Sequence, residues 1–505
     1  MNLTAALSRS IAAASGSGSH GGRLLPSSHP ALLVCGAGLI AVAFGLLAAQ
    51  VAGAPTQVNA LLLVGIVAPY LAIALGVLRK FLLAVIVLDI PLGWDIHLGW
   101  RAEAAEIGAT GGFGLSVTTA ALAALYAIWF AESMVQSPTN RIRPQLRMAL
   151  PVIMFVGVSA LSILVATDVQ LAGFGLWTIV QALLLFIYIS SNIRTPEQVN
   201  FIVTLLLVGV AFVALASVAA LIGFGVDIAG ISTAASDSGR LSGTLGAPNG
   251  AGAYFAFLLA PAAAVALTAE SGWRRGLAGF SFVMGVVALI LTSSRGGWLA
   301  FLIAMAILSL WGVRARWLRP SMIVVGAVLL VTLVAPFAGR ITERVTGADD
   351  RVAAESRLPL IKLAGDIIED QPVTGVGVNN FTVAIPEYAG PEFTGAFLFA
   401  APNKYLLVWA EAGIVALIAF AWFLLATVRR SWIVYAARDP VLSPLGLAFT
   451  GAIVGQMVHM TVDTFQGRQG VQLLWLSAAV VAAMSLIVVQ GRRSATREQP
   501  ARLST

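Results

Sequence analysis

The sequence has few charged residues, one cysteine and four histidines. Charged residues make up 10% of the 505 residues, whereas soluble domains carry about 25%, so a soluble globular protein is excluded. The single cysteine, Cys35, excludes an intrachain disulfide and a metal site built from cysteines. His20 and His29 lie in the polar N-terminal tail. Only His97 and His459 therefore remain as histidine candidates for chemistry.

Nucleotide-binding and metal-binding motifs are also missing. The chain shows no glycine-rich nucleotide loop and no set of metal ligands at a recognisable spacing. We therefore predict neither a cofactor nor a metal ion. The net charge is +7, but the basic residues gather at the ends of apolar segments instead of forming tracts, which argues against a nucleic-acid partner.

Long apolar runs dominate the chain. Apolar residues make up 59% of the sequence, and runs long enough to cross a bilayer predict an all-α polytopic membrane protein of about 14 transmembrane helices, within a range of 12 to 14. The third run contains Asp89 and Pro91, so a re-entrant segment is an alternative for it. The fourteen runs are 31–53, 57–78, 80–98, 113–132, 148–166, 171–191, 199–224, 250–269, 275–292, 296–313, 320–338, 404–428, 443–463 and 470–490.

The distribution of lysine and arginine predicts the orientation. With fourteen spans and a cytoplasmic N-terminus, twenty of the 30 cations fall on the inner face, whereas deleting the third span leaves most of them outside. Both termini are therefore predicted to be cytoplasmic. A signal peptide ending near Ala54 is a competing interpretation of the first run, but its apolar core is too long. The predicted parts are a disordered tail 1–30, helices 31–224, a core 225–490 and a disordered tail 491–505.

One long external loop, 339–403, carries most of the external charge. Within it, residues 352–370 predict an amphipathic helix that lies on the membrane or caps a cavity. Its apolar side is predicted from Leu358, Ile361, Ile367 and Ile368. A purely structural lid is the alternative.

Two isolated arginines lie in short external loops. Arg240 belongs to a glycine-rich segment that opens a span, where free backbone amides and a helix N-terminus favour an anion. Arg295 lies in the tight hairpin between two spans. Two guanidinium groups suit a diphosphate, because each can bind a phosphate bidentately. The alternative for each is an arginine that extends to the membrane interface.

Three further polar residues lie inside predicted spans. Glu411 is seven residues into the twelfth. His459 and Asp463 are four residues apart in the thirteenth, which places them on one helical face. Such a pair is typical of an acid/base unit, and equally of a polar clamp between helices.

From Arg240 to Asp463 the chain resembles the O-antigen ligase and Wzy-type polymerase superfamily of polytopic bacterial glycosyltransferases. The resemblance rests on the order and membrane placement of several loose motifs. They are Arg240-Leu241-Ser242-Gly243-Thr244-Leu245-Gly246-Ala247-Pro248-Asn249, Ser293-Ser294-Arg295-Gly296-Gly297, Ser356-Arg357, Gly375-Val376-Gly377, Asn380-Phe381, Asn403-Lys404-Tyr405-Leu406 and Glu411-Ala412-Gly413-Ile414.

The resemblance implies a fold like that of the polytopic GT-C glycosyltransferases, in the bacterial cytoplasmic membrane. It implies transfer of a glycan from an undecaprenyl-diphosphate carrier to a glycan or lipid acceptor at the outer face of that membrane. Membrane lipids, a flippase and a chain-length regulator are the further partners it implies. The family's two functional arginines map onto Arg240 and Arg295. The candidate substrate-binding residues are these two arginines with Asn249, Arg357, Asn403, Lys404 and Glu411.

One departure from the family pattern bears on the reaction. Ligases of the family usually have a histidine directly before Asn403, and this sequence has Pro402 there. The expected base or acceptor-orienting group is missing, which disfavours a lipid A-core ligase and favours a polymerase of surface polysaccharide repeat units or, as the alternative, a ligase for another lipid or protein acceptor. The base is left open. His459 with Asp463, an external carboxylate (Glu387 or Glu392), or no strong base at all are the alternatives.

General chemistry supports the same function. A polyprenyl-diphosphate glycan needs a groove open to lipid, two cations at headgroup depth and a roofed external cavity. Stabilising the charge on the departing diphosphate supplies most of the catalysis. A transporter of a small anion is the alternative from another class, although the polar groups gather at the outer rim instead of at mid-membrane. A non-catalytic scaffold would leave the paired arginines unexplained.

Overall fold

The computed structural model describes residues 72–73, 76–138, 140–221, 224, 227–228, 231–232, 240–346, 357–389 and 400–502; for 493–502 it describes only the backbone. The chain forms two units, Met1–Phe81 and Leu82–Thr505. Nearly all the described residues belong to the second unit. The first two predicted spans, 31–53 and 57–78, lie almost entirely outside the described residues.

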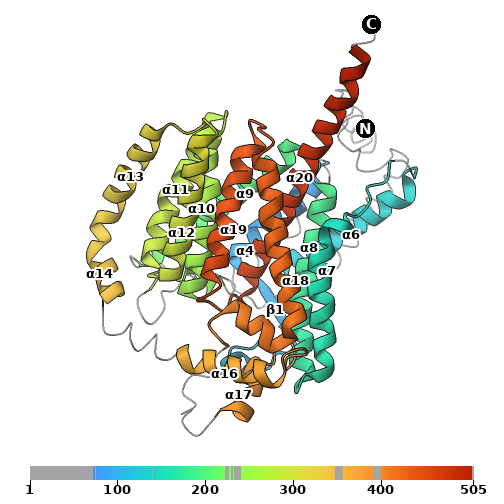
Figure 1. The fold of residues 1–505 in the computed structure, drawn as a ribbon, viewed down its shortest axis with the longest axis vertical. Helices are drawn as coiled ribbons and strands as arrows, with labels where there is room; N and C mark the ends of the chain where they lie inside the picture. The colour runs from blue at the N-terminus through green and yellow to red at the C-terminus, as the bar shows by residue number, and fades with distance from the viewer. Residues whose placement is uncertain are drawn as a thin grey trace, which may run out of the picture. The chain divides into compact units, whose positions relative to one another are not determined.

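The second unit is a bundle of long helices (Figure 1), and its described strands form two small antiparallel pairs, β1–β2 and β3–β4. The elements up to residue 245 are α4 Leu78–Leu92, β1 Asp95–Leu98, α5 Ala102–Glu106, β2 Phe113–Ser116, α6 Val117–Val135, α7 Leu146–Leu161, η1 Ser162–Val165, α8 Val169–Asn192, α9 Pro196–Leu221, β3 Asp227–Ile228, β4 Ile231–Ser232 and η2 Gly243–Leu245. They are followed by α10 Pro248–Thr268, α11 Gly272–Leu291, α12 Arg295–Arg314, α13 Pro320–Val334, η3 Ala335–Phe337, α14 Ala338–Thr346, α16 Arg357–Asp370, α17 Phe381–Tyr388, α18 Lys404–Tyr435, α19 Leu442–His459 and α20 Arg468–Arg502.

Within the described residues, eleven helices are long and apolar enough to cross a membrane. They coincide with the fourth to fourteenth predicted runs, so the prediction of an all-α polytopic membrane protein is confirmed. The third run, 80–98, is different, and its short helix favours the re-entrant alternative over a full span. Its helix α4 has 15 residues and is about 22 Å long at 1.5 Å per residue, too short for a hydrocarbon core of about 30 Å. The remainder forms strand β1.

Strands β1 and β2 form an antiparallel hairpin in which Asp95 pairs with Ser116 and Leu98 with Phe113. Asp89 explains why α4 stops near this hairpin. Its buried carboxylate accepts hydrogen bonds from the backbone of Trp94 and from both the backbone and the hydroxyl of Thr118. A carboxylate partnered in this way ends the apolar helix and fixes the start of α6.

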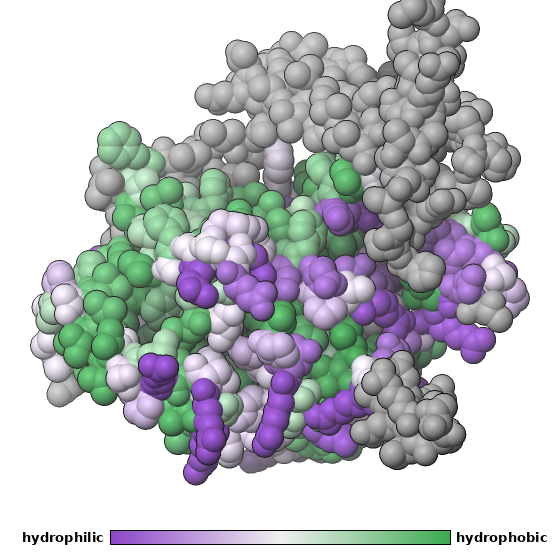
Figure 2. Space-filling view, turned by 90° about the horizontal axis from the view of Figure 1, so that it is seen from above, coloured by the Kyte–Doolittle hydropathy of each residue, from purple (hydrophilic) through white to green (hydrophobic). Residues whose placement is uncertain are grey.

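The loops predicted to be external gather at one end of the bundle. At this end Asn379 donates to the carbonyl of Thr110, Arg344 to that of Ser293, and the backbone N–H of Lys404 to that of Met460. The opposite end holds exposed cations of the loops predicted to be cytoplasmic, including Arg275 and Arg438. Figure 2 views the bundle from that opposite end and shows hydrophilic side chains gathered on it.

The core of the bundle is formed by α10, α19 and α20, the most buried of the span-length helices. Small residues bring α12 and α19 into backbone contact: a Cβ on Gly455 would lie 2.4 Å from the carbonyl oxygen of Ala300, and one on Gly451 2.7 Å from that of Ala304. Such contacts are how membrane helices pack without a hydrophobic driving force between them. Helix α8 packs on α20 and α9 on α11, so helices from both sides of residue 224 pack together.

The long loop predicted to be external contains a helix, α16, as the sequence predicted. The residues on the buried side of this helix differ from the predicted ones. Residues 352–356 of the predicted helix lie outside the described part of the chain. The buried side consists of Leu360, Leu363, Ala364, Ile367 and Ile368. Leu358 and Ile361 instead lie on the exposed side. The buried side packs on α17 and on the first turns of α18 (Figure 1).

Two helices extend beyond their predicted ends. The span 320–338 continues through η3 into α14 and ends at Thr346, so the loop begins eight residues later than predicted. Helix α13 has no buried residue and lies at the edge of the bundle (Figure 1). Helix α20 continues to Arg502, where the sequence predicted a disordered tail from 491.

Candidate functional site

The candidate site is built on the turn between α11 and α12. Ser294 is the N-cap of α12, and its hydroxyl accepts a hydrogen bond from the backbone N–H of Gly297. Ser293 before it has φ of 51°, a left-handed conformation that is costly for a residue other than glycine. The carbonyl oxygens of Thr292 and Ser293 accept hydrogen bonds from arginines, which hold this turn in its strained shape.

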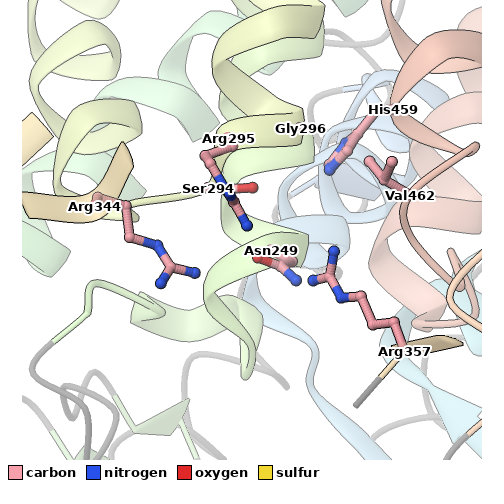
Figure 3. A pocket seen from close by; sticks show the side chains of 8 residues that line it. All are labelled: Asn249, Ser294, Arg295, Gly296, Arg344, Arg357, His459 and Val462. Atoms are coloured by element: carbon pink, nitrogen blue, oxygen red, sulfur yellow. The ribbon is translucent and has the colours of Figure 1, made fainter. Parts of the chain in front are cut away.

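Three arginines from three different helices point into one hollow beside this turn (Figure 3). Arg295 is the first residue of α12, Arg344 lies in α14 and Arg357 is the first residue of α16. None of the eight lining residues is acidic. The hollow is lined by Asn249, Ser294, Arg295, Gly296, Arg344, Arg357, His459 and Val462. Such a lining suits an anion with several oxygen atoms.

The electrostatics of the neighbouring Arg240 indicate how strongly positive this region is. Burial, and after it the repulsion from Arg344, Arg357 and Arg295, lowers the pKa of the Arg240 guanidinium to about 10. The group still carries its proton at neutral pH. Binding a dianion among these cations would relieve the repulsion, so the arrangement favours such a ligand.

Arg240 does not line the hollow as the sequence predicted. Its Nε donates to the carbonyl of Thr292 at 3.0 Å, and its Nη2 donates to the Oδ1 of Asn249 at 3.0 Å and to the carbonyl of Ser293 at 3.4 Å. Arg240 therefore braces the strained turn from behind. It orients Asn249, which does line the hollow.

The hollow itself is small, with a volume of about 30 Å³, which is room for about one water molecule. A diphosphate would fit only after the three arginine side chains have spread apart. Their long, rotatable stems allow this movement without a change in the helices that carry them.

His459 lies against Gly296 at the first turn of α12. A Cβ on Gly296 would lie 2.4 Å from the ring Cδ2 and 2.8 Å from the ring Nε2 of His459, so only glycine leaves room for the imidazole. The ring is buried, and its Nδ1 has no hydrogen-bond partner among the described residues. Among the described residues that line the hollow, the imidazole of His459 is the one candidate base.

His459 and Asp463 do not share a helical face as predicted, although the charge of Asp463 acts on the His459 imidazole. Helix α19 ends at His459, with Met460 as its C-cap, so Asp463 does not lie on the next turn. Its Oδ1 accepts the backbone N–H of Phe465 at 2.8 Å. Phe465 has φ of 47°, and Asp463 therefore stabilises a strained turn in the segment between α19 and α20.

Glu411, Asn403 and Lys404, predicted as substrate contacts, do not line the hollow. Asn403 is the N-cap of α18, where its Oδ1 accepts the backbone N–H groups of Tyr405 and Leu406. Glu411 is buried and its Oε1 accepts the backbone N–H of Phe381 at 3.4 Å. Lys404 experiences the charges of both Glu411 and Asp463. These three residues hold the external loop and the start of α18.

The sequence reasoning missed Arg344, because the predicted span ended at residue 338 and placed Arg344 in a loop. A signal was available: residues 338–346 read Ala-Gly-Arg-Ile-Thr-Glu-Arg-Val-Thr, without a helix breaker after Gly339. The helix therefore continues and carries Arg344 to the strained turn, where its Nε donates to the carbonyl of Ser293 at 3.1 Å.

The chain is similar to a known protein family over part of its length. No curated protein matches the chain. Residues 280–421 match the family model Wzy_C, described as O-antigen ligase. The match begins within α11 and ends within α18, so it covers the strained turn, Arg295, Arg344 and Arg357. Over residues 280–421 the chain is thus similar to the O-antigen ligase family, whose members are multi-pass membrane glycan transferases, and its described span-length helices agree with a multi-pass membrane protein.

Proposed function

We propose that the protein polymerises the repeat units of a surface polysaccharide, using an undecaprenyl-diphosphate-linked glycan as donor at the outer face of the cytoplasmic membrane. The family match supports a polyprenyl-linked donor and a glycan or lipid acceptor. Ligation of a finished glycan to a lipid or protein acceptor is the related alternative. The proposed reaction requires neither a metal ion nor a cofactor.

The observation that carries the proposal is the convergence of Arg295, Arg344 and Arg357 on one hollow without an acidic side chain in its lining. A glycan diphosphate carries its negative charge next to the bond that breaks. Cations held in place before the reaction stabilise the charge that develops on the departing diphosphate. Because the guanidinium groups come from three helices, they can bind oxygen atoms of both phosphates.

The proposed reaction is a glycosyl transfer in which the lipid diphosphate is the leaving group. The bond between the anomeric carbon of the donor sugar and the diphosphate oxygen breaks, and its electron pair leaves with the lipid diphosphate. A hydroxyl oxygen of the acceptor forms the new bond to that carbon. The hydroxyl proton passes to a base, for which the Nδ1 or Nε2 of His459 is the candidate beside the hollow.

The glycans that accumulate in cells lacking the activity distinguish polymerase from ligase. In cells whose only copy carries Arg295→Ala, a polymerase defect leaves single repeat units on the lipid carrier. A ligase defect leaves long polymers on the carrier. Electrophoresis of extracted lipid-linked glycans separates the two. A pool of carrier-linked glycan identical to that of wild-type cells would contradict both forms of the proposal.

We expect His459→Ala to lower the rate of transfer by about 10²–10⁴-fold, the usual contribution of a general base, with donor binding unchanged. Asp463→Asn is expected to cause a smaller loss, because Asp463 lies beyond the end of α19 and supports the turn at Phe465. Single-turnover transfer and equilibrium binding of the donor measure the two effects separately. Turnover at the wild-type rate in His459→Ala would remove the histidine and leave departure of the diphosphate as the driving step.

The proposed orientation predicts which end of the bundle faces outward. In a Cys35→Ser background, a cysteine at the exposed Glu369 of α16 is expected to react with a membrane-impermeant maleimide in spheroplasts. A cysteine at the exposed Arg438 on the opposite end serves as the matched control and is expected to react only after lysis. The reverse pattern would invert the topology and exclude transfer at the outer face.

A further inference from the structure

A second cavity lies at the same end of the bundle, apart from the arginine-lined hollow. Its volume of about 310 Å³ falls at the lower end of the range of about 300–1,000 Å³ that holds small ligands. The hairpin β1–β2, the segment 108–110, helix α8 and the segment 466–469 all contribute to its lining. Most of this lining belongs to a part of the chain that the family match does not cover.

The lining of this cavity is polar but its charges are paired. The Asp95 carboxylate lies 3.0 Å from the Nε of Arg468, and the Nη1 of Arg468 lies 3.1 Å from the carboxylate of Asp89. The hollow, in contrast, is lined by three arginines. A diphosphate therefore favours the hollow, whereas the second cavity suits a neutral, hydrogen-bonding ligand.

Three side chains of the lining have hydrogen-bonding capacity left for a ligand. Within the described part of the chain, the side chains of His97, Gln466 and Gln469 form no hydrogen bond to the protein. Gln181 differs, because its amide is fixed by hydrogen bonds to the carbonyl of Gly114 and the hydroxyl of Thr119. The cavity thus combines a fixed polar wall with three side chains that both donate and accept hydrogen bonds.

An exposed aromatic ring lies beside the cavity. The ring of Trp100 lies 4.8 Å from that of His97, centroid to centroid, and Trp100 is 53% exposed. Planar amides, an imidazole and an exposed indole face together suit a sugar ring, which presents hydroxyl groups at its edge and C–H groups on its faces.

The second cavity is connected to the hollow by a short segment of chain. Val462 lines the hollow and Gln466 lines the second cavity. Four residues of extended chain span at most about 14 Å, so the two cavities are within reach of one oligosaccharide. The turn that Asp463 stabilises at Phe465 fixes the segment between them.

We propose that the second cavity binds an uncharged sugar residue of the glycan that is being transferred, through His97, Gln466 and Gln469. This inference rests on the proposed function, because it assumes that a glycan diphosphate occupies the hollow. The sugar belongs either to the donor, whose diphosphate then lies among the arginines, or to the acceptor.

The test uses the full-length protein in nanodiscs and two probes. The first probe is the oligosaccharide released by mild acid from the lipid-linked glycans of the host cells, observed by saturation-transfer NMR. The second probe is inorganic pyrophosphate, which reports on the hollow alone. Gln469→Ala and His97→Ala are expected to weaken oligosaccharide binding about tenfold, equal to a loss of about 1.4 kcal/mol, and to leave pyrophosphate binding unchanged.

Two control variants make the result specific. Gln170→Ala removes an exposed glutamine amide at the same end of the bundle that does not line the cavity, and it is expected to bind both probes like the wild type. Arg295→Ala is expected to lose pyrophosphate and keep the oligosaccharide. Failure of pyrophosphate to bind the wild type would contradict the proposed function. Oligosaccharide binding that is absent, or equal in Gln469→Ala, His97→Ala and the wild type, would overturn the sugar site.

A competition experiment between the free oligosaccharide and the intact lipid-linked glycan distinguishes a donor sugar from an acceptor sugar. If the cavity holds a donor sugar, the intact lipid-linked glycan displaces the free oligosaccharide from the wild type. If it holds an acceptor sugar, the two bind together.

Discussion

Arg295→Lys is expected to slow glycan transfer by about two to three orders of magnitude, which corresponds to a loss of about 2–4 kcal/mol of transition-state stabilisation. Lysine keeps the positive charge but lacks the planar pair of donors that binds a phosphate bidentately. Arg295 begins α12 and lines the hollow, so its guanidinium cannot be replaced by a neighbour on the same helix. Single-turnover transfer from a purified lipid-linked glycan measures the effect.

The matched control for this variant is Arg275→Lys. Arg275 also belongs to a short hairpin between two spans, but at the opposite end of the bundle, where it donates to the carbonyl of Ala269. We expect wild-type transfer from this variant. If Arg295→Lys likewise transferred glycan at the wild-type rate while binding the donor normally, the arginine would have no part in stabilising the leaving group.

Arg240 provides an informative contrast with Arg295. Its guanidinium donates hydrogen bonds to Thr292, Ser293 and Asn249, and a lysine ammonium cannot reproduce this planar pattern. Arg240→Lys is therefore expected to loosen the strained turn as well as slow the reaction. We expect Arg240→Lys to lower the melting temperature, because the turn then loses its hydrogen bonds from this guanidinium to Thr292 and Ser293.

The sequence predicted those parts of the fold that depend on local properties. Span length and hydropathy are local, and the eleven described spans follow from them. The exception is α4, where Asp89 stops the helix because Thr118 and Trp94 supply its hydrogen bonds. These partners come from a hairpin and a helix later in the chain, so no local pattern at residue 89 reveals them.

The candidate site was predicted only in part, for a related reason. An ionisable residue inside a membrane span is generally taken as a candidate functional residue, and for this reason Glu411 was predicted to contact the substrate. Its actual partner is the backbone of Phe381, thirty residues away. His459 was identified as a candidate, but its proximity to Arg295 depends on the close packing of α12 on α19 at Gly296. The sequence shows that a glycine stands at position 296, but it does not show which side chain packs against it.

Gly413→Ala is expected to destabilise the protein strongly and to release the external loop. Gly413 lies inside α18 with φ of 79° and ψ of 175°, a region that is essentially restricted to glycine. A Cβ at this position would lie 1.8 Å from the carbonyl oxygen of Val373. Backbone strain costs about 1–3 kcal/mol and overpacking a similar amount, so we expect the free energy of unfolding to fall by at least about 2 kcal/mol.

The break in α18 at Gly413 is what attaches the external loop to the bundle. The carbonyls of Ala410 and Glu411 accept the backbone N–H groups of Val376 and Gly377, and the N–H of Ile414 donates to the carbonyl of Pro372. In an unbroken helix, the carbonyls of Ala410 and Glu411 and the N–H of Ile414 would form hydrogen bonds within α18. The loop would then lose its three backbone hydrogen bonds to this helix. Because Arg357 enters the hollow from α16 of the same loop, release of the loop is expected to abolish transfer as well.

Limited proteolysis of the 357–389 segment and a thermal melt measure the two consequences of Gly413→Ala. The matched control is Gly279→Ala in α11, where an added Cβ would meet no atom within 4 Å. That substitution is expected to raise stability by about 0.5–1 kcal/mol, since alanine favours a helix over glycine. If Gly413→Ala melted like the wild type and its loop resisted proteolysis equally, α18 would tolerate a side chain at its break. The attachment of Arg357 to the site through this backbone junction would then be wrong.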